Sequence, residues 1–160
     1  MDYLFDVDGT LLDITHRLKF IQKKPKDWKA FRDPIQKRWD EPIIPIINIF
    51  NALRAAGHNT IIVSARTKDE EEDTRKTLNN WIPGMLDYDP KHEDYKIPMY
   101  LRSNRDHRND TVVKAEILET IRMDGYNPVM VFDDRPKVIN MWHEQGLKVG
   151  DVRDPSKGEF

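Results

Sequence analysis

Short apolar runs alternate with stretches of helical periodicity along this chain. Apolar runs that end at glycine or at polar residues are typical of strands buried on both faces of a parallel sheet. On this pattern we expect strands at residues 3–7, 60–64, 97–101, 129–132 and 147–152.

Apolar residues spaced three and four positions apart predict helices between these runs. Thr67 and Glu70 have the spacing of a capping box, and Pro136 suits a first helical turn. Gly146 stands where the C-cap of the last helix belongs, and Asp110 can serve as an N-cap. We therefore expect helices at residues 46–53, 68–81, 110–123 and 136–145.

Strands that alternate with helices imply an α/β fold, in which a doubly wound parallel sheet forms the middle of three layers. One domain spans residues 1–160 on this view, because no repeat or linker divides the chain. Residues 13–42 are polar and irregular, and we expect them to form a minimal cap. Trp28, Phe31 and Trp39 are expected to be the core of this cap, although aromatic rings among lysines can also stack on nucleobases.

The composition is that of a globular domain, with 160 residues, 34% charged and 38% hydrophobic. No apolar run is long enough to span a membrane, and the first residues lack the features of a secretory signal. The absence of cysteine excludes disulfides, thiolate metal sites and cysteine nucleophiles. We expect a cytoplasmic protein without membrane contact, and nothing in the sequence indicates its oligomeric state.

Basic residues are concentrated in two segments, although the net charge is only −2. Either segment can be a solvated helix face or can follow a phosphodiester backbone. The first segment holds two acidic residues, Asp27 and Asp33, and the basic residues Arg17, Lys19, Lys23, Lys24, Lys26, Lys29, Arg32, Lys37 and Arg38. The second consists of Arg102, Arg105, His107 and Arg108.

Polar side chains stand at the ends of three predicted strands, as the pairs Asp6 and Asp8, Ser64 and Arg66, and Asp133 and Asp134. The carboxyl ends of parallel strands meet at one edge of a sheet, and ligands of such folds bind beyond that edge. A sheet built for stability alone does not need four carboxylates there. The sequence therefore predicts a functional site at this edge, although each pair taken alone could simply cap a helix or form a salt bridge.

Oxygen ligands without histidine or cysteine favour Mg²⁺, so we expect Asp6, Asp8, Asp133 and Asp134 to hold this cation. A carboxylate beside the cation can attack phosphorus in a phosphate monoester, which gives Asp6 the role of nucleophile. Asp8 can protonate the leaving oxygen and then activate water. Ser64 and Lys114 can stabilise charge on the phosphoryl group.

Four motifs in order resemble those of the haloacid dehalogenase (HAD) superfamily of phosphohydrolases. They are Asp6-Val7-Asp8-Gly9-Thr10-Leu11, Ile61-Ile62-Val63-Ser64, the lone basic residue Lys114, and Phe132-Asp133-Asp134. A lone Asp-x-Asp-Gly is a weak signal, whereas four motifs with suitable spacing after apolar strands are a specific one. The resemblance implies a Rossmann-like sheet, dependence on Mg²⁺ and an aspartyl-phosphate intermediate.

Most of the chain is also similar to the 3′-phosphatase domain of phage-type polynucleotide kinase-phosphatases. The similarity runs through residues 63–66, 108–117, 133–135, Val138, Met141-Trp142 and Gly158-Glu159-Phe160. It implies that Arg17, Arg66, Arg102, Asp110 and Lys114 match further functional residues, and Arg108 is a candidate for substrate binding from the second basic segment. The sequence holds no Gly-x-x-x-x-Gly-Lys-[Ser/Thr] motif, so kinase activity is not implied.

Three functions compete on these observations. The first is removal of 3′-phosphates from nucleic acid ends, and the second is hydrolysis of small phosphorylated metabolites or mononucleotides. The third is a binding module without catalysis, which has no need for intact Asp6, Asp8, Ser64 and Asp133-Asp134. Arg108 and Asp110 can also pair with each other on the surface.

Overall fold

A parallel five-stranded sheet forms the middle layer of the computed structural model, which describes residues 1–157. The C-terminal Gly158-Glu159-Phe160 of the sequence resemblance lies outside the described residues. All four pairings of neighbouring strands are parallel, in the order β7-β4-β1-β8-β9. The strands are β1 (Asp2–Phe5), β4 (Asn59–Thr67), β7 (Met99–Arg102), β8 (Pro128–Asp133) and β9 (Lys148–Asp151). The five strands predicted from the sequence are confirmed.

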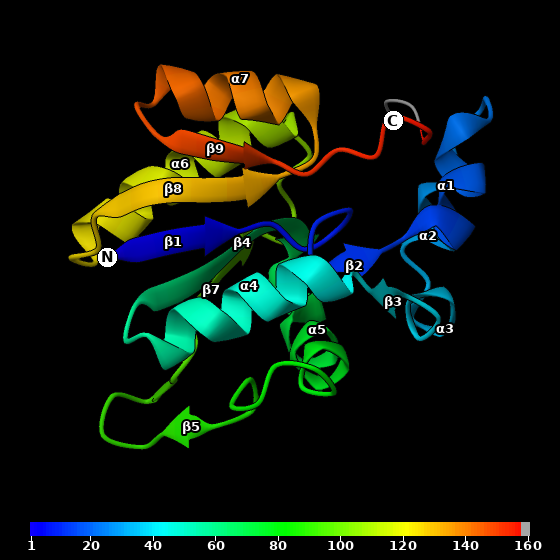
Figure 1. The fold of residues 1–160 in the computed structure, drawn as a ribbon. Coiled ribbons are helices and arrows are strands. Elements are labelled where there is room, and N and C mark those ends of the chain that lie inside the picture. Colours follow the sequence, from blue (N-terminus) through cyan, green and yellow to red (C-terminus); the bar gives the residue numbers. More distant parts are fainter. Residues whose placement is uncertain (158–160) are drawn as a thin grey trace.

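Helices cover both faces of the sheet and complete the three-layer α/β fold (Figure 1). The alternation of side chains along β1 shows how the two faces are filled: Leu4 packs into one hydrophobic cluster and Phe5 into the other, and both are fully buried. The helices on the Leu4 side are α6 (Asp110–Met123) and α7 (Pro136–Glu144), and those on the Phe5 side are α4 (Ile44–Ala55) and α5 (Glu71–Leu78).

The boundaries of two helices differ from those predicted. The capping box of Thr67 and Glu70 is present, but it begins a 3₁₀ turn, η1 (Lys68–Glu70), and α5 then ends at Leu78. The predicted N-cap role of Asp110 is wrong, because Asn109 occupies the cap position and Asp110 is the first helical residue. A short hairpin of β5 (Tyr88–Asp89) and β6 (Asp94–Tyr95) was not expected from the sequence.

The segment for which the sequence predicts a minimal cap lies at the carboxyl ends of the strands and is more regular than expected (Figure 1); we refer to it as the cap. Its ends meet in an antiparallel pair that joins Leu12 to Pro42 and Asp13 to Glu41. Its elements are β2 (Leu12–Asp13), α1 (Thr15–Gln22), α2 (Trp28–Phe31), α3 (Pro34–Lys37) and β3 (Glu41–Pro42). Two of the helices have only four residues each and start at the aspartate caps Asp27 and Asp33, so they leave no periodic pattern in the sequence.

The hydrophobic core of the cap is small and excludes both cap tryptophans. Ile14, Leu18 and Ile21 are buried together, and Phe31 packs against them. Trp28 is 46% exposed and Trp39 is 70% exposed. The expectation that all three aromatic residues form the core is therefore correct only for Phe31.

None of the helices in residues 1–157 is long and apolar enough to cross a bilayer.

Candidate active site

Four of the six polar residues predicted at the strand ends line one cavity of about 770 Å³, between the edge of the sheet and the cap: Asp6, Asp8, Ser64 and Arg66. Asp133 and Asp134 are not among its lining residues. Asp6 follows β1, Ser64 lies in β4 and Lys114 comes from α6, while Arg17 and Lys37 come from the cap. Acidic lining residues are Asp6, Asp8, Glu70 and Asp110. Basic ones are Arg17, Lys26, Arg32, Lys37, Arg66, Arg102, Arg108, Lys114, Arg135 and Lys137. The excess of cations gives the cavity a lining suited to anions.

Lys114 joins two carboxylates at the floor of this cavity. Its Nζ donates to Asp6 Oδ1 at 2.9 Å and to Asp133 Oδ2 at 2.8 Å. Trp142, buried on α7, also donates to Asp133 Oδ2, at 3.1 Å from Nε1. Burial alone would lower the pKa of Lys114, but the charges of Asp133 and Asp6 raise it well above its ordinary value. Lys114 is therefore a permanent cation that fixes the position of Asp6.

Asp134 completes a group of three acidic residues with Asp6 and Asp133, in which one carboxylate oxygen of each residue lies within 4.8 Å of those of the other two. Its carboxylate lies against Gly9, which has φ of +84°; a Cβ there would come within 2.0 Å of Asp134 Oδ2. Only glycine fits this position. The other oxygen, Asp134 Oδ1, is buried and has no hydrogen-bond partner within residues 1–157.

The charge in this group is not balanced. Burial, and then the nearby charge of Asp133, raises the pKa of Asp134 to about 7. Burial also raises the pKa of Asp6 well above its ordinary value, against the effect of Lys114, and Asp133 and Asp134 add to the increase. Three carboxylates with one ammonium group and an unpartnered buried oxygen are a donor set that fits a hard cation.

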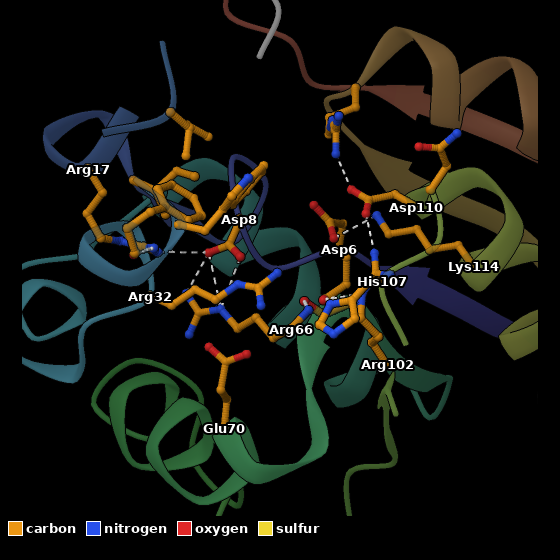
Figure 2. A pocket seen from close by; sticks show the side chains of 18 of the residues that line it. Asp6, Asp8, Arg17, Arg32, Arg66, Glu70, Arg102, His107, Asp110 and Lys114 are labelled. Carbon is orange, nitrogen blue, oxygen red and sulfur yellow. Dashed lines mark hydrogen bonds and ion pairs between the residues drawn. The ribbon is translucent and has the colours of Figure 1, made fainter. Parts of the chain in front are cut away.

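The carboxylate of Asp8 lies on the cap side of the cavity and is not part of this group (Figure 2). Arg66 Nη2 donates to Asp8 Oδ1 at 2.5 Å, and Arg17 Nη2 donates to the same oxygen at 3.2 Å. Burial alone would raise the pKa of Asp8, but Arg66 and then Arg17 lower it well below its usual range. The side chain of Asp8, which the sequence placed among the metal ligands, is held by arginines in this structure and lies outside the group of Asp6, Asp133 and Asp134.

Asp40 connects the two arginines from within the cap. Arg17 reaches it through Nε and Nη2, both at 2.8 Å, and Arg66 Nη2 reaches it at 3.0 Å. The Asp40 side chain is fully buried. We refer to Asp8, Arg17, Asp40 and Arg66 as the arginine clamp. The clamp joins the cap to the core of the domain through two matched pairs of opposite charges.

A second ion pair across the cap was missed from the sequence. Lys37, at the end of α3, pairs with Glu70 of η1. Burial, and then the charge of Arg66, lowers the pKa of Lys37 to about 8. No local pattern distinguished Lys37 or Asp40 from other charged residues, and the capping-box spacing of Glu70 gave no sign of its pairing with Lys37, because the partners are distant in the sequence.

Arg102 is buried and holds the loop of residues 103–109 in place. It donates from Nε to Ala65 O at 3.0 Å and from Nη1 to Arg108 O at 2.6 Å, and it pairs with Asp110. Arg135 is a second partner of Asp110; it belongs to the segment 133–135 of the family resemblance but was not among the predicted site residues.

Arg108 has a different environment on the outside of this loop. Its side chain is 50% exposed and pairs with Asp106 at 2.8 Å and Glu116 at 2.6 Å. The alternative in which Arg108 pairs with Asp110 is therefore wrong. Ser64, in contrast, is buried beside the cavity, where its Oγ accepts a hydrogen bond from Arg66 N at 3.2 Å.

The sequence matches the model of a known protein family. A family described as "Polynucleotide kinase PNKP phosphatase domain" matches residues 2–160. The chain belongs to this family. It is a HAD-type phosphatase, as the four sequence motifs implied.

Relatives of this PNKP-type phosphatase domain include much longer proteins. A "Putative bifunctional polynucleotide kinase/RNA ligase" of Autographa californica nuclear polyhedrosis virus is 34% identical over 151 residues, which are 93% of this chain and 18% of the viral protein. The chain thus spans less than a fifth of that relative.

Solved structures support the fold. A chain in a structure titled "Structure of Pnkp1/Rnl/Hen1 complex" aligns with a TM-score of 0.72 and 22% identity, over 99% of this chain and 47% of its own. The class C acid phosphatase from Bacillus anthracis with tungstate bound aligns with a TM-score of 0.62 and 16% identity, over 96% and 66%. These likenesses show a HAD-like α/β fold.

Proposed function

We propose that this phosphatase removes 3′-phosphates from polynucleotide ends, with Mg²⁺ as cofactor and an aspartyl-phosphate on Asp6 as intermediate. The observation that carries the proposal is the group of Asp6, Asp133 and Asp134, in which Lys114 bonds Asp6 and Asp133 and lines a cation-rich cavity together with Asp6. A nucleophilic carboxylate and an anionic phosphate repel each other, and this arrangement is built to offset that repulsion.

The first step transfers the phosphoryl group to the protein. An oxygen of Asp6 attacks phosphorus, and the bond between phosphorus and the 3′ oxygen of the substrate breaks. Asp8 gives its proton to that leaving oxygen. In the free enzyme Arg66 and Arg17 hold Asp8 ionised; a phosphate anion bound beside them opposes their effect and raises the pKa of Asp8 toward the range in which it carries a proton.

The second step restores the enzyme. Asp8, now ionised, takes a proton from a water molecule whose oxygen attacks phosphorus, and the bond between phosphorus and Asp6 breaks. Inorganic phosphate leaves and Asp6 is again a free carboxylate. Lys114 keeps Asp6 in place throughout, and Ser64 donates to a phosphoryl oxygen.

Asp6, Asp133 and Asp134 are the residues that would hold Mg²⁺. The oxygen-only donor set and the unpartnered Asp134 Oδ1 support this assignment. When bound, the cation screens the repulsion between the phosphoryl group and the carboxylates.

Two observations support a polynucleotide rather than a small metabolite. The family is described by its occurrence in polynucleotide kinases, and the viral relative is named as a polynucleotide kinase/RNA ligase. In addition, basic side chains of the cap and of the 103–109 loop line the same cavity as Asp6 and Asp8, and a backbone that continues beyond the terminal phosphate needs such countercharge.

The test compares a 3′-phosphorylated oligonucleotide with the matching 3′-mononucleotide, at low and high salt. The proposal expects a higher kcat/KM for the oligonucleotide, with an advantage that falls as salt rises. An equal or higher kcat/KM for the mononucleotide at both salt concentrations would favour a phosphatase of small metabolites instead.

A further inference from the structure

Trp28 is a large aromatic side chain that the fold of the cap does not require. It lies on α2, remains 46% exposed and lines the cavity that holds Asp6 and Asp8. The core of the cap is made by Ile14, Leu18, Ile21 and Phe31 without it. A half-exposed indole that lines a cation-rich cavity indicates that Trp28 contacts the ligand of this cavity.

A short series of contacts fixes Trp28 relative to the catalytic residues. Arg17, which binds Asp8, places its guanidinium 4.6 Å from the centre of the Phe31 ring and donates to the Phe31 carbonyl at 2.8 Å. Phe31 in turn meets Trp28 edge to face, with 5.8 Å between ring centres and an interplanar angle of 89°. The side chains of Arg17 and Phe31 therefore connect Asp8 to Trp28 and hold the indole in place.

Cations surround the ring. Lys26 Nζ lies 5.4 Å and Arg32 Cζ 5.6 Å from the centre of the Trp28 ring, and both residues line the cavity. Figure 2 shows Arg32 on the same side of the cavity as Arg17 and Asp8. These long side chains can move from the ring to a phosphodiester, and this would leave a face of the indole for another flat ring.

We propose that Trp28 is a stacking platform for a nucleobase within the last two nucleotides of a single-stranded 3′ end, with Lys26 and Arg32 beside the adjoining phosphodiester. This proposal rests on the proposed function and deepens it. An aromatic platform next to positive charge is how single strands are bound without sequence preference, because every base has a flat π-face. A mononucleotide offers at most one base and no adjoining phosphodiester, so this surface also gives a reason for preferring a polymer.

The experiment compares Trp28→Ala with Trp39→Ala, a matched control on the same cap. Trp39 is 70% exposed and does not line the cavity. KM and kcat are measured for a 3′-phosphorylated oligonucleotide, for the same oligonucleotide with abasic residues at its last two positions, and for an aryl phosphate. Trp28→Ala should raise KM for the intact oligonucleotide about tenfold or more, and by a clearly larger factor than for the aryl phosphate. Trp28→Phe should recover part of this loss.

The abasic substrate makes the test specific to stacking. Wild type and Trp39→Ala should show the same increase in KM when the two bases are removed, whereas Trp28→Ala should show almost none. Equal losses of Trp28→Ala on the oligonucleotide and the aryl phosphate would mean a structural role and overturn the proposal. So would a Trp28→Ala variant that still distinguishes the intact from the abasic oligonucleotide as wild type does.

A binding measurement separates failure of this proposal from failure of the proposed function. Oligonucleotide added to the inactive Asp6→Asn enzyme should quench tryptophan fluorescence, and Trp28→Ala in that background should remove most of the quenching. Quenching that persists without Trp28 would overturn the stacking role alone, with oligonucleotide turnover by the wild type intact. A wild type that hydrolyses aryl phosphate but not the 3′-phosphorylated oligonucleotide would overturn both.

Discussion

Asp6 and Asp8 lie two residues apart after the same strand, yet their surroundings differ in kind. Asp6 faces Asp133 and Asp134 with Lys114 as the nearest cation, and burial raises its pKa. Asp8 faces Arg66 and Arg17, and its pKa is lowered. Figure 2 shows Asp8 beside Arg17 and Arg66, and Asp6 apart from them beside Lys114.

The difference lies in where the balancing charge comes from. In the arginine clamp, two guanidinium groups match the two carboxylates of Asp8 and Asp40 within the protein itself. In the carboxylate group, one ammonium faces three acids, and a buried oxygen of Asp134 has no partner among residues 1–157. One side of the cavity is electrostatically complete, and the other fits a cation from solution. The predictions below test this division.

The largest effect is expected for Asp6→Asn. An amide cannot attack phosphorus, so turnover should fall about 10⁴-fold or more. The fold should persist, because the substitution removes a charge whose burial is unfavourable while Oδ1 can still accept from Lys114. Phosphate release and circular dichroism measure the two effects. Activity within tenfold of wild type would exclude Asp6 as the nucleophile.

Asp8→Asn should lower thermal stability as well as activity, whereas Asp6→Asn should lower activity alone. Turnover of a 3′-phosphorylated oligonucleotide should fall about 10²- to 10⁴-fold with the loss of a general acid and base. Release of the alcohol from p-nitrophenyl phosphate should fall less, since that leaving group departs without a proton. Unlike Asp6→Asn, this variant should lower Tm, because Arg17 and Arg66 lose a matched charge. A Tm equal to that of wild type would contradict the difference between the two sides.

Arg66→Lys tests the geometry of the clamp without a change in charge. The guanidinium bonds Asp8, Asp40 and Thr74 at the same time, which a lysine cannot do. Turnover of the oligonucleotide should fall about 10- to 100-fold. Arg122→Lys serves as control, because Arg122 lies on the exposed side of α6 and bonds only the Gln145 carbonyl among the contacts described. Equal kinetics for Arg66→Lys and wild type would show that charge alone suffices.

The pH dependence of stability should reveal the unbalanced side. The pKa of Asp134 is raised from 3.8 to about 7 in the folded protein. Between these values the folded state holds a proton that the unfolded state has released, so stability without divalent cations should fall as pH rises through this window. Mg²⁺ should then raise Tm by several degrees at pH 8 and by less at pH 5. Thermal unfolding with chelator or with Mg²⁺ measures both effects. In Asp134→Asn, Tm should depend neither on pH in this window nor on Mg²⁺. A wild type whose Tm does not change with Mg²⁺ at pH 8 would contradict the cation site.

The smallest effect is expected for Arg108→Ala. Arg108 is exposed and already paired with Asp106 and Glu116. Loss of its side chain should therefore raise KM for the oligonucleotide by about threefold or less. Arg102→Ala should instead impair both oligonucleotide and aryl phosphate, because Arg102 holds the loop and Asp110. Parallel assays on the two substrates distinguish these outcomes. A large loss confined to the oligonucleotide in Arg102→Ala would give Arg102 a direct role in binding.

The sheet and the positions of Asp6, Ser64 and Asp133 could be predicted because they follow from local patterns. Apolar runs mark the strands, and side chains at the ends of parallel strands must meet at one edge. Arg66, a partner of Asp8, stands at one of these strand ends, but its connection through Asp40 to Arg17 could not be predicted in this way. Asp40 contacts Arg17 from 23 positions away and Arg66 from 26, through an insert without periodicity.

Trp28 and Trp142 show the same limit for aromatic residues. Helical periodicity favours a buried position for Trp142, which is fully buried, but it gives no sign that the indole nitrogen donates to Asp133. For Trp28, composition favoured the core of the cap, and only the packing of Phe31 in its place leaves the indole exposed at the cavity. Patterns predict burial well where elements are long, whereas short helices depend on tertiary contacts.

Trapping of the phosphoryl group tests the central claim most directly, namely that Asp6 is the nucleophile and Asp8 serves as acid and base on the other side of the cavity. The Asp8→Asn enzyme is mixed with p-nitrophenyl phosphate and Mg²⁺, quenched in acid within one turnover, and analysed by peptide mass spectrometry. The account predicts a burst of p-nitrophenol and one phosphoryl group on the peptide that contains Asp6. A phosphoryl group on another residue, or simultaneous release of alcohol and phosphate with no labelled peptide, would contradict it.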